Sequence, residues 1–283
     1  MPLKHISVIG AGTMGNGIAQ VCATSGYDVT LIDVSKDALK RAKETIAGSV
    51  KKLHSKDKLS DEARDRALKN IQTATAMKAA AEADMVIEAA TENKPLKLKL
   101  FAELDEIMRP GVILASNTSS ISITEIAAAT KRPEHVVGVH FMNPVPLMEL
   151  VEIIRGYATS AETLHTVLEL TRSMGKTPVE AADYPGFISN RVLCPMINEA
   201  IFAVMEGVGT PEAIDTVMKL GMNHPMGPLT LADFVGLDVV LAVMDVLYDG
   251  YGDPKYRACP LLRKMVAAGH LGKKTGRGFY TYE

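Results

Sequence analysis

The sequence predicts an α/β protein with a mostly parallel sheet, a helical hairpin inserted into it, and an all-helical C-terminal part. Two observations support this prediction. Up to about residue 184, short β-branched runs alternate with longer stretches at helical spacing, which is typical of βαβ units. From residue 185 onward only helical patterns remain. We therefore expect two domains, residues 1–184 and 185–283, in a chain whose length suits one or two cores.

The elements of the first domain are expected in alternating order along the chain. Strands are predicted at 6–10, 29–34, 85–90, 112–117, 136–140 and 150–154, and helices at 16–25, 36–70, 96–108 and 161–174. The segment from Ser35 to about Leu53 has apolar residues at helical spacing, and the densely charged stretch after it continues the helical pattern. We expect these residues to form a solvated helical hairpin that projects from the sheet.

The second domain is expected to contain four helices. They are predicted at 187–207, 211–221, 231–252 and 259–269. This part of the chain is richer in Met, Leu and Val than about a hundred residues need for a core of their own. We therefore expect a homodimer formed through it.

The composition is that of an ordinary soluble enzyme. Apolar residues make up 47% and charged residues 23%, and the formal net charge is −2, so neither a nucleic-acid partner nor a membrane partner is indicated. Three cysteines, Cys22, Cys194 and Cys259, show no disulfide or zinc-ligand spacing, so no metal is expected and a reducing compartment is favoured. The apolar run at the N-terminus is too short for a signal peptide, which makes the cytoplasm the expected location.

A glycine-rich turn follows the first predicted strand. Gly10 permits a tight turn, Gly12 leaves room for a pyrophosphate beside the backbone, and Gly15 allows the next helix to pack closely on the strand. The second strand ends at Asp33, which is placed to accept hydrogen bonds from both ribose hydroxyls. This context predicts a Rossmann-type NAD site. Its cofactor-binding residues are expected to be Gly10, Gly12, Thr13, Met14, Gly15 and Asp33.

Asp33 favours NAD over NADP because its charge repels a 2′-phosphate. FAD is the competing dinucleotide, since flavoproteins share the glycine turn. A nonbinding glycine-rich turn is the structural alternative.

A histidine and a glutamate stand where acid/base chemistry could occur. His140 lies at the end of the apolar run from Val136, where open α/β sheets place their ligands. Glu152 lies inside an apolar strand, where a carboxylate needs a partner such as an imidazole. A secondary alcohol oxidised by hydride transfer must also lose a proton, and histidine suits that role near neutral pH. From the residues alone, His140 could equally be a satisfied core histidine.

Several motifs together resemble the 3-hydroxyacyl-CoA dehydrogenase family over essentially the whole chain. They are GAGTMGNGIA at 10–19, EAATEN at 88–93, SNTSS at 116–120, HFMNPVPLMELVEII at 140–154, PGFISNR at 185–191, HPMGP at 224–228 and GKKTGRGFY at 272–280. The resemblance implies His140 as the general acid/base and Glu152 as its orienting partner. It also implies that Ser119 and Asn190 contact the substrate oxygen and carbonyl.

The resemblance extends to further cofactor positions. It places Asn117 near the nicotinamide ribose, and Glu92, Lys97 and Lys274 near the cofactor. The alternative for Lys97 is a solvated helix start, because lysines also stand at 94 and 99.

An acyl-CoA substrate would need a basic surface for its phosphates. Ser49, Lys51, Lys52 and Lys56, on the expected hairpin, are the candidates. Any charged surface helix carries such residues, so a solvated face remains the alternative.

The implied function is interconversion of (S)-3-hydroxybutyryl-CoA and acetoacetyl-CoA with NAD. A longer-chain 3-hydroxyacyl-CoA dehydrogenase, a sugar-acid dehydrogenase of the L-gulonate type and a noncatalytic NAD-binding protein remain as alternatives. The acyl-chain length depends on pocket volume, which no motif encodes.

Overall fold

The computed structural model describes residues 3–282. They form two compact units, which meet in the sequence between Asp183 and Tyr184. The boundary expected from the sequence, after Tyr184, lies one residue beyond this division. Each unit has its own hydrophobic core.

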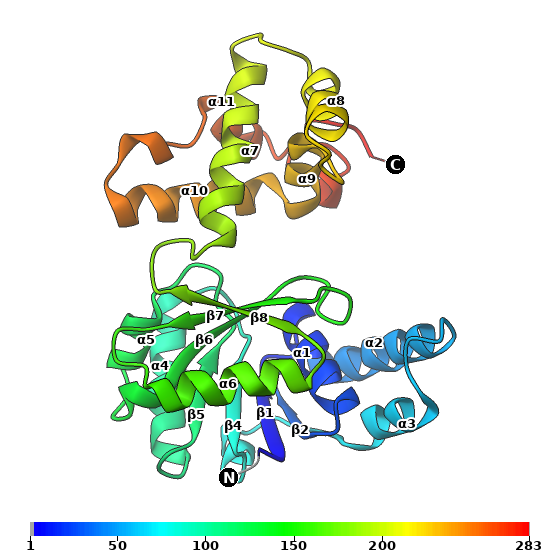
Figure 1. Ribbon diagram of the computed structural model, residues 1–283, viewed down its shortest axis with the longest axis vertical. Coiled ribbons are helices and arrows are strands. Elements are labelled where there is room, and N and C mark those ends of the chain that lie inside the picture. Colours follow the sequence, from blue (N-terminus) through cyan, green and yellow to red (C-terminus); the bar gives the residue numbers. More distant parts are fainter. Residues whose placement is uncertain (1–2, 283) are drawn as a thin grey trace. The chain divides into compact units, whose positions relative to one another are not determined.

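The first unit is built on one eight-stranded sheet of order β3-β2-β1-β4-β5-β6-β7-β8 (Figure 1). The strands are β1 (His5–Ile9), β2 (Asp28–Ile32), β3 (Ile71–Ala74), β4 (Met85–Glu88), β5 (Ile113–Ser116), β6 (Val136–Phe141), β7 (Leu150–Arg155) and β8 (Thr177–Ala182). Neighbouring strands are parallel except β6 and β7. The prediction of a mostly parallel sheet is confirmed.

Most helices of the first unit begin at a side chain that caps them, although the first helix does not. They are α1 (Thr13–Thr24), α2 (Lys36–His54), α3 (Asp61–Lys69), α4 (Lys94–Ile107), α5 (Ile123–Ala128) and α6 (Ala161–Ser173), with the short 3₁₀ helices η1 (Met77–Ala80) and η2 (Pro133–His135). Ser35, Ser60 and Ser160 each accept a hydrogen bond from the backbone N–H three residues further on. A serine in this position satisfies a donor that the helix leaves unpaired.

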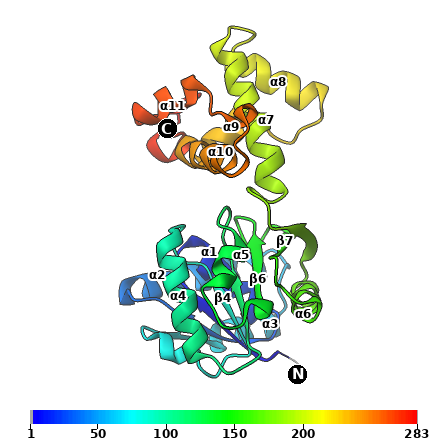
Figure 2. The same cartoon turned by 90° about the vertical axis from the view of Figure 1, so that its left-hand side faces the viewer.

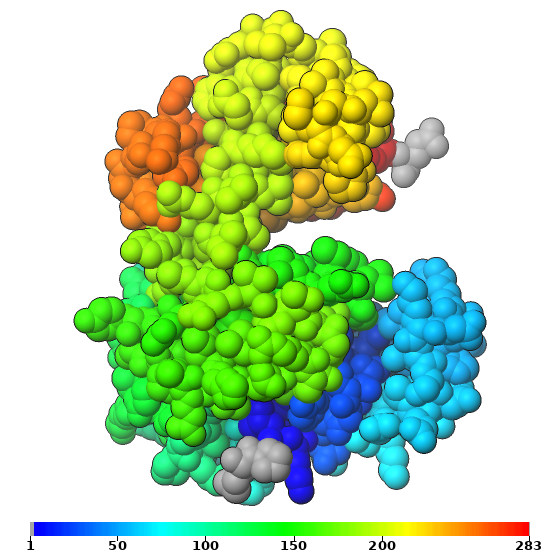
Figure 3. Space-filling model, viewed as in Figure 1, coloured from blue at the N-terminus to red at the C-terminus, as the bar shows by residue number. Residues whose placement is uncertain are grey.

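The hairpin expected after β2 is present as α2 and α3. Four residues on one side of α2 are buried, namely Leu39, Ala42, Ile46 and Val50. Helix α3 packs back on α1 as well as on α2. In Figure 3 this hairpin forms the blue lobe at the edge of the first unit.

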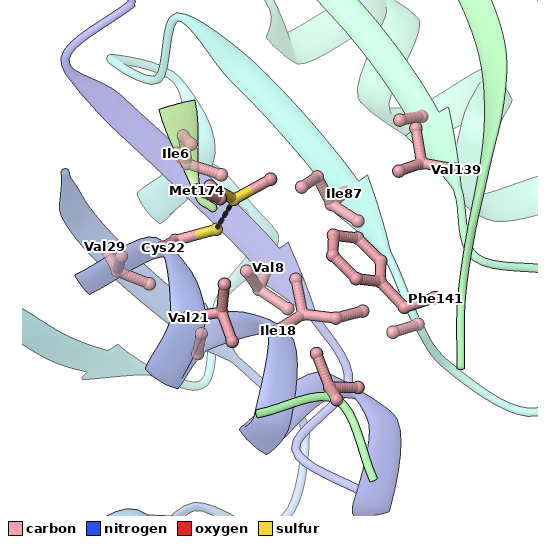
Figure 4. Packing of buried hydrophobic residues seen from close by; sticks show 14 of the residues in the cluster. Ile6, Val8, Ile18, Val21, Cys22, Val29, Ile87, Val139, Phe141 and Met174 are labelled. Atoms are coloured by element: carbon pink, nitrogen blue, oxygen red, sulfur yellow. Dashed lines mark hydrogen bonds between the residues drawn. The ribbon is translucent and has the colours of Figure 1, made fainter. Parts of the chain in front are cut away.

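The core of this unit lies between the sheet and its helices. Figure 4 shows Ile18 and Val21 of α1 beside Val8 of β1, and the Cys22 thiol is 3.7 Å from the sulfur of Met174. Helix α6 also belongs to this cluster. Helix α4 lies on the opposite side of the sheet from α6 (Figure 2). The carboxyl ends of β1, β4 and β5 therefore emerge between two helical layers.

Besides the two 3₁₀ helices, three elements of the first unit were not expected from the sequence. Strand β3 is short and buries only Ile71 fully, and β8 buries only Ala181, so neither has an apolar run. Helix α5 has six residues, which is too short for a clear periodic pattern.

The second unit is helical, as predicted. It contains α7 (Ser189–Met205), α8 (Pro211–Gly221), α9 (Pro228–Val235), α10 (Leu237–Tyr251), α11 (Pro260–Ala267) and the 3₁₀ helices η3 (Pro254–Tyr256) and η4 (Lys273–Thr275). The single helix expected at 231–252 is wrong, because Gly236 adopts a φ of +102° and separates α9 from α10. An interior glycine with positive φ interrupts the helical hydrogen-bond series.

Candidate active site

The glycine turn between β1 and α1 has the geometry that its residues require. Gly10 has a φ of +101°, which a residue with a side chain rarely adopts. A Cβ on Gly15 would stand 1.8 Å from the Gly10 carbonyl oxygen, so only glycine permits this close approach. A Cβ on Gly12 would meet no atom within 4 Å. The space beside Gly12 is therefore open, as a cradle for a phosphate group would be.

Asp33 lies at the end of β2 and faces this turn. One carboxylate oxygen accepts the Ala11 N–H at 2.8 Å, and the other accepts the Ser35 N–H at 2.8 Å. The carboxylate thus fixes both the glycine turn and the start of α2. A ribose bound here would donate its hydroxyl hydrogens to a carboxylate that two backbone N–H groups already hold in place.

A pocket of about 740 Å³ opens beside these residues. Its lining includes Gly10, Gly12, Thr13, Met14 and Asp33. Its size lies within the range of cofactor sites. Gly12 is the N-cap of α1 and supplies no side-chain acceptor, so a bound anion would find unpaired backbone N–H groups at the start of this helix. These residues fit a dinucleotide bound through its pyrophosphate and ribose.

His140 and Glu152 form the centre of a second group. They lie directly opposite each other in the β6/β7 pair, and the His140 Nδ1 is 2.8 Å from Glu152 Oε2. Both are buried, with exposed fractions of 7% and 1%. The carboxylate accepts from Nδ1–H, so Nε2 is the nitrogen that faces away from it. Ser119 Oγ lies 3.0 Å from that nitrogen.

Ser119 belongs to a turn that Glu92 holds. Glu92 Oε1 accepts hydrogen bonds from the Thr118 hydroxyl, from the Ser119 and Ser120 N–H groups, and from the Ser120 hydroxyl, at 2.6–3.1 Å. Its other oxygen is 3.6 Å from Lys97 Nζ.

Lys97 is not part of a solvated helix start. It is 1% exposed, and its Nζ lies 2.6 and 2.9 Å from the two oxygens of Glu88, which is fully buried. Ser116 Oγ and the Ala90 N–H also donate to Glu88. The solvated alternative is therefore wrong for Lys97, although Lys94 fits it and pairs with Glu125 at the surface.

Asn117 acts within the same group of loops. Its Oδ1 accepts the Phe141 N–H at 2.9 Å, which ties the end of β5 to the residue after His140.

Asn190 and Lys274 belong to the second unit. Asn190 lies in the first turn of α7, and its Oδ1 is 4.0 Å from the Cys194 sulfur. Burial raises the pKa of the Cys194 thiol to about 12, so the thiol stays neutral and is a weak donor. Lys274 Nζ donates to Asp238 at 2.7 Å.

The candidate CoA residues lie on and after the last turns of α2. Ser49 is half-buried, whereas Lys51, Lys52 and Lys56 are exposed. Lys51 and Lys52 also stand at the helix C-terminus, where positive charge is favourable without any ligand.

Sequence reasoning missed Glu88, which neutralises Lys97, although a carboxylate ending an apolar strand was an available signal. It also missed the apolar residues of the pocket contributed by η1 and α4. These include Met77, Leu96 and Leu100, which no motif marks.

Within residues 3–282, no group of three or more His, Cys, Asp or Glu side chains is placed to hold a metal ion. None of the helices described in that range is both long and apolar enough to span a bilayer.

Comparison with known families matches both parts of the chain. Residues 5–184 match the NAD-binding domain of 3-hydroxyacyl-CoA dehydrogenase, and residues 186–282 match the C-terminal domain of that family.

Individual relatives are similar over nearly their full lengths. A probable 3-hydroxybutyryl-CoA dehydrogenase of Deinococcus radiodurans is 58% identical over 97% of this chain and 99% of its own. The 3-hydroxybutyryl-CoA dehydrogenase of Bradyrhizobium diazoefficiens is 55% identical over 99% of this chain and 96% of its own. The crystal structure of (S)-3-hydroxybutyryl-CoA dehydrogenase from Ralstonia eutropha is 51% identical, with a TM-score of 0.97 and coverage of 100% of both chains.

Proposed function

Because the chain belongs to the 3-hydroxyacyl-CoA dehydrogenase family, we propose that it interconverts (S)-3-hydroxybutyryl-CoA and acetoacetyl-CoA by NAD-dependent hydride transfer. The observation that carries the proposal is the series Ser119–His140–Glu152, with contacts of 3.0 and 2.8 Å, in which His140 and Glu152 are buried. The similarity to relatives named for this substrate supports the acyl chain of four carbons.

His140 is the general acid/base of the proposed mechanism. With Nδ1–H donated to Glu152, Nε2 of the neutral ring takes the hydroxyl proton during oxidation and returns it to the carbonyl oxygen during reduction. The Glu152 carboxylate keeps the ring oriented and stabilises the imidazolium that forms. Its burial makes this pairing strong, because little water competes for either partner.

Ser119 and Asn190 are the proposed contacts to the substrate oxygen and carbonyl. The Ser119 hydroxyl can donate to a substrate oxygen or accept from it, and so suits both the alcohol and the ketone. Asn190 supplies an amide that can do the same.

Bound NAD would supply the hydride acceptor in oxidation and, when reduced, the hydride donor. In the proposal, Gly10, Gly12, Thr13, Met14 and Gly15 form the pyrophosphate turn, and Asp33 accepts from the adenosine ribose. Glu92, Lys97, Asn117 and Lys274 are the further cofactor candidates. Ser49, Lys52 and Lys56 are the candidates for the CoA moiety.

The test substitutes glutamine for Glu152. Glu152→Gln should lower kcat for acetoacetyl-CoA reduction by about 100-fold, within the range that positioned acid/base groups contribute. The KM for NADH should remain unchanged, since Glu152 lies outside the dinucleotide pocket. Glu180→Gln, on the exposed side of β8, is the matched control and should be fully active. Unchanged turnover in Glu152→Gln would remove this residue from the mechanism.

Substrate range is tested by comparing acetoacetyl-CoA with longer 3-oxoacyl-CoA thioesters, and with L-gulonate and NAD. A kcat/KM highest for the four-carbon thioester supports the proposal. A higher kcat/KM for a longer thioester or for L-gulonate would show that the proposed substrate is wrong. The proposed role of His140 and Glu152 would then still stand.

Assembly as a homodimer is part of the same proposal. Large apolar side chains of the second unit are exposed, among them Val192 on α7 and Val217 and Leu220 on α8. Such side chains support a contact with a second copy. Light scattering at twice the chain mass of 30.4 kDa is the expected result. We also propose a cytoplasmic location, because the cysteine spacing suits a reducing compartment.

A further inference from the structure

The segment that carries Ser119 lies between two carboxylates from distant parts of the sequence. Glu92 Oε1 holds residues 118–120 through two backbone N–H groups and two hydroxyls. Asp183 holds residues 122–124 in a similar way. Ile121, between the two anchored stretches, is buried.

Asp183 makes three hydrogen bonds to this segment. Its Oδ1 accepts the Ile123 N–H at 3.0 Å, and its Oδ2 accepts the Thr124 N–H at 2.7 Å and the Ser122 hydroxyl at 2.8 Å. The Asp183 N–H in turn donates to the Arg155 carbonyl at the end of β7. Through its backbone and its side chain, Asp183 therefore joins the end of β7 to the first turn of α5.

From this arrangement we propose that Asp183 and Glu92 are positioning residues that hold the Ser119 hydroxyl against His140 Nε2. The inference rests on the proposed function, because it assigns to these carboxylates the placement of a group that binds the reacting oxygen. Neither carboxylate acts on the substrate in this role. Each carboxylate accepts hydrogen bonds from donors of residues 118–124. Without these bonds the segment would be free to shift.

Ionised carboxylates suit this role because they only accept hydrogen bonds. The five anchored groups between Thr118 and Ser122 include the Ser119 N–H itself, so moving the Ser119 backbone breaks a bond to Glu92 directly. Moving the start of α5 breaks bonds to Asp183. Since a displacement of about 1 Å can cost on the order of 100-fold in rate, even a partial release of the segment should be measurable.

The decisive experiment is a double-mutant cycle between Asp183→Asn and Ser119→Ala. Asparagine keeps one acceptor oxygen but places an amide donor against a backbone donor. We expect Asp183→Asn to lower kcat by about tenfold, which is less than the loss on the order of 100-fold that a displacement of Ser119 by about 1 Å would cause. Its KM for NADH should change by less than about twofold, because Asp183 does not line the dinucleotide pocket. In the Ser119→Ala background the same substitution should have almost no effect on kcat, because a shift of the segment cannot misplace a hydroxyl that is already absent, and sites coupled through a backbone shift are not additive.

Asp105→Asn is the matched structural control. Asp105 is a buried carboxylate of the same unit that accepts the Lys131 N–H and the Arg132 guanidinium. Asparagine there should lower the unfolding temperature and leave kcat unchanged in the folded protein. All rates are measured below the unfolding transition of each variant.

Glu92 provides an independent arm. Glu92→Ala removes the acceptor of four bonds and should lower kcat, whereas Glu92→Gln keeps one acceptor oxygen and should lower kcat less than Glu92→Ala does. Because Glu92 is also a cofactor candidate, Glu92→Ala is measured in the Ser119→Ala background as well, and the part of its loss in kcat that disappears there is the part due to positioning.

The outcomes are distinct for the two proposals. If Ser119→Ala is as active as the wild type, the role of Ser119 in the proposed function is wrong. If Ser119→Ala is slow but Asp183→Asn has full kcat, the positioning role is wrong and the proposed function stands. An equal loss from Asp183→Asn with and without Ser119 would also overturn the positioning role.

Discussion

Replacing Lys97 with methionine should destabilise the first unit strongly. The variant removes the ammonium that lies 2.6 and 2.9 Å from the Glu88 oxygens, while Glu88 itself is fully buried. Breaking a buried ion pair costs about 3–5 kcal/mol, because one charge is left without its partner. Glu88 would still accept from Ser116 and from the Ala90 N–H, so we expect about 3 kcal/mol, at the lower end of that range.

This loss corresponds to a fall in unfolding temperature of roughly 6–12 °C for a unit of this size. The assay is thermal unfolding followed by circular dichroism at pH 7. Lys99→Met is the matched control, because Lys99 is exposed on the same helix, and its unfolding temperature should change little.

A second variant tests the cause of the loss. Adding Glu88→Gln to Lys97→Met should restore about half of the lost stability, because a neutral amide is cheaper to bury than an unpaired carboxylate. An unfolding temperature for Lys97→Met equal to that of Lys99→Met would refute the reasoning. NADH affinity, measured below the transition, then tests the proposed cofactor role of Lys97 separately.

Two further predictions concern the proposed nucleotide and CoA sites. Gly12→Ala should fold normally, because its Cβ meets no protein atom, yet weaken NADH binding about 100-fold by occupying the space beside the turn. Gly15→Ala should lower the unfolding temperature, because its Cβ would stand 1.8 Å from the Gly10 oxygen. NADH titration and thermal unfolding of both variants check this pair, and equal behaviour of the two would contradict it. Lys56→Ala should raise the KM for acetoacetyl-CoA severalfold but leave the KM for the N-acetylcysteamine thioester unchanged, because only the former carries the CoA phosphates. Equal effects on both thioesters would remove Lys56 from the CoA site.

The features predicted well from the sequence are those in which neighbouring residues act together. The glycine turn is a run of six residues, so its tight turn, close packing and open side could each be argued locally. His140 and Glu152 are twelve residues apart, and two consecutive strands bring them opposite each other. An apolar strand that contains a carboxylate already requires such a partner.

The features that were missed depend on residues that are distant in the sequence. In the sequence Lys97 has the pattern of a surface lysine. Only the fold brings Glu88, at the end of β4, into contact with it. Asp183 reads as a loop residue, because its partners lie about sixty residues earlier, at the start of a helix too short to recognise. Strand β8 lacks an apolar pattern, because only one of its residues is buried.

The two backbone hydrogen bonds of Asp33 have a consequence for how cofactor preference can change. A substitution that removes the carboxylate to admit a 2′-phosphate also removes the acceptor for Ala11 in the glycine turn and for Ser35 at the start of α2. If Asp33 sets the cofactor preference as proposed, the same side chain controls both that preference and the conformation of the glycine turn. A lineage that moves toward NADP must first acquire another acceptor for these two amides, and this requirement makes a single-step exchange of cofactor unfavourable.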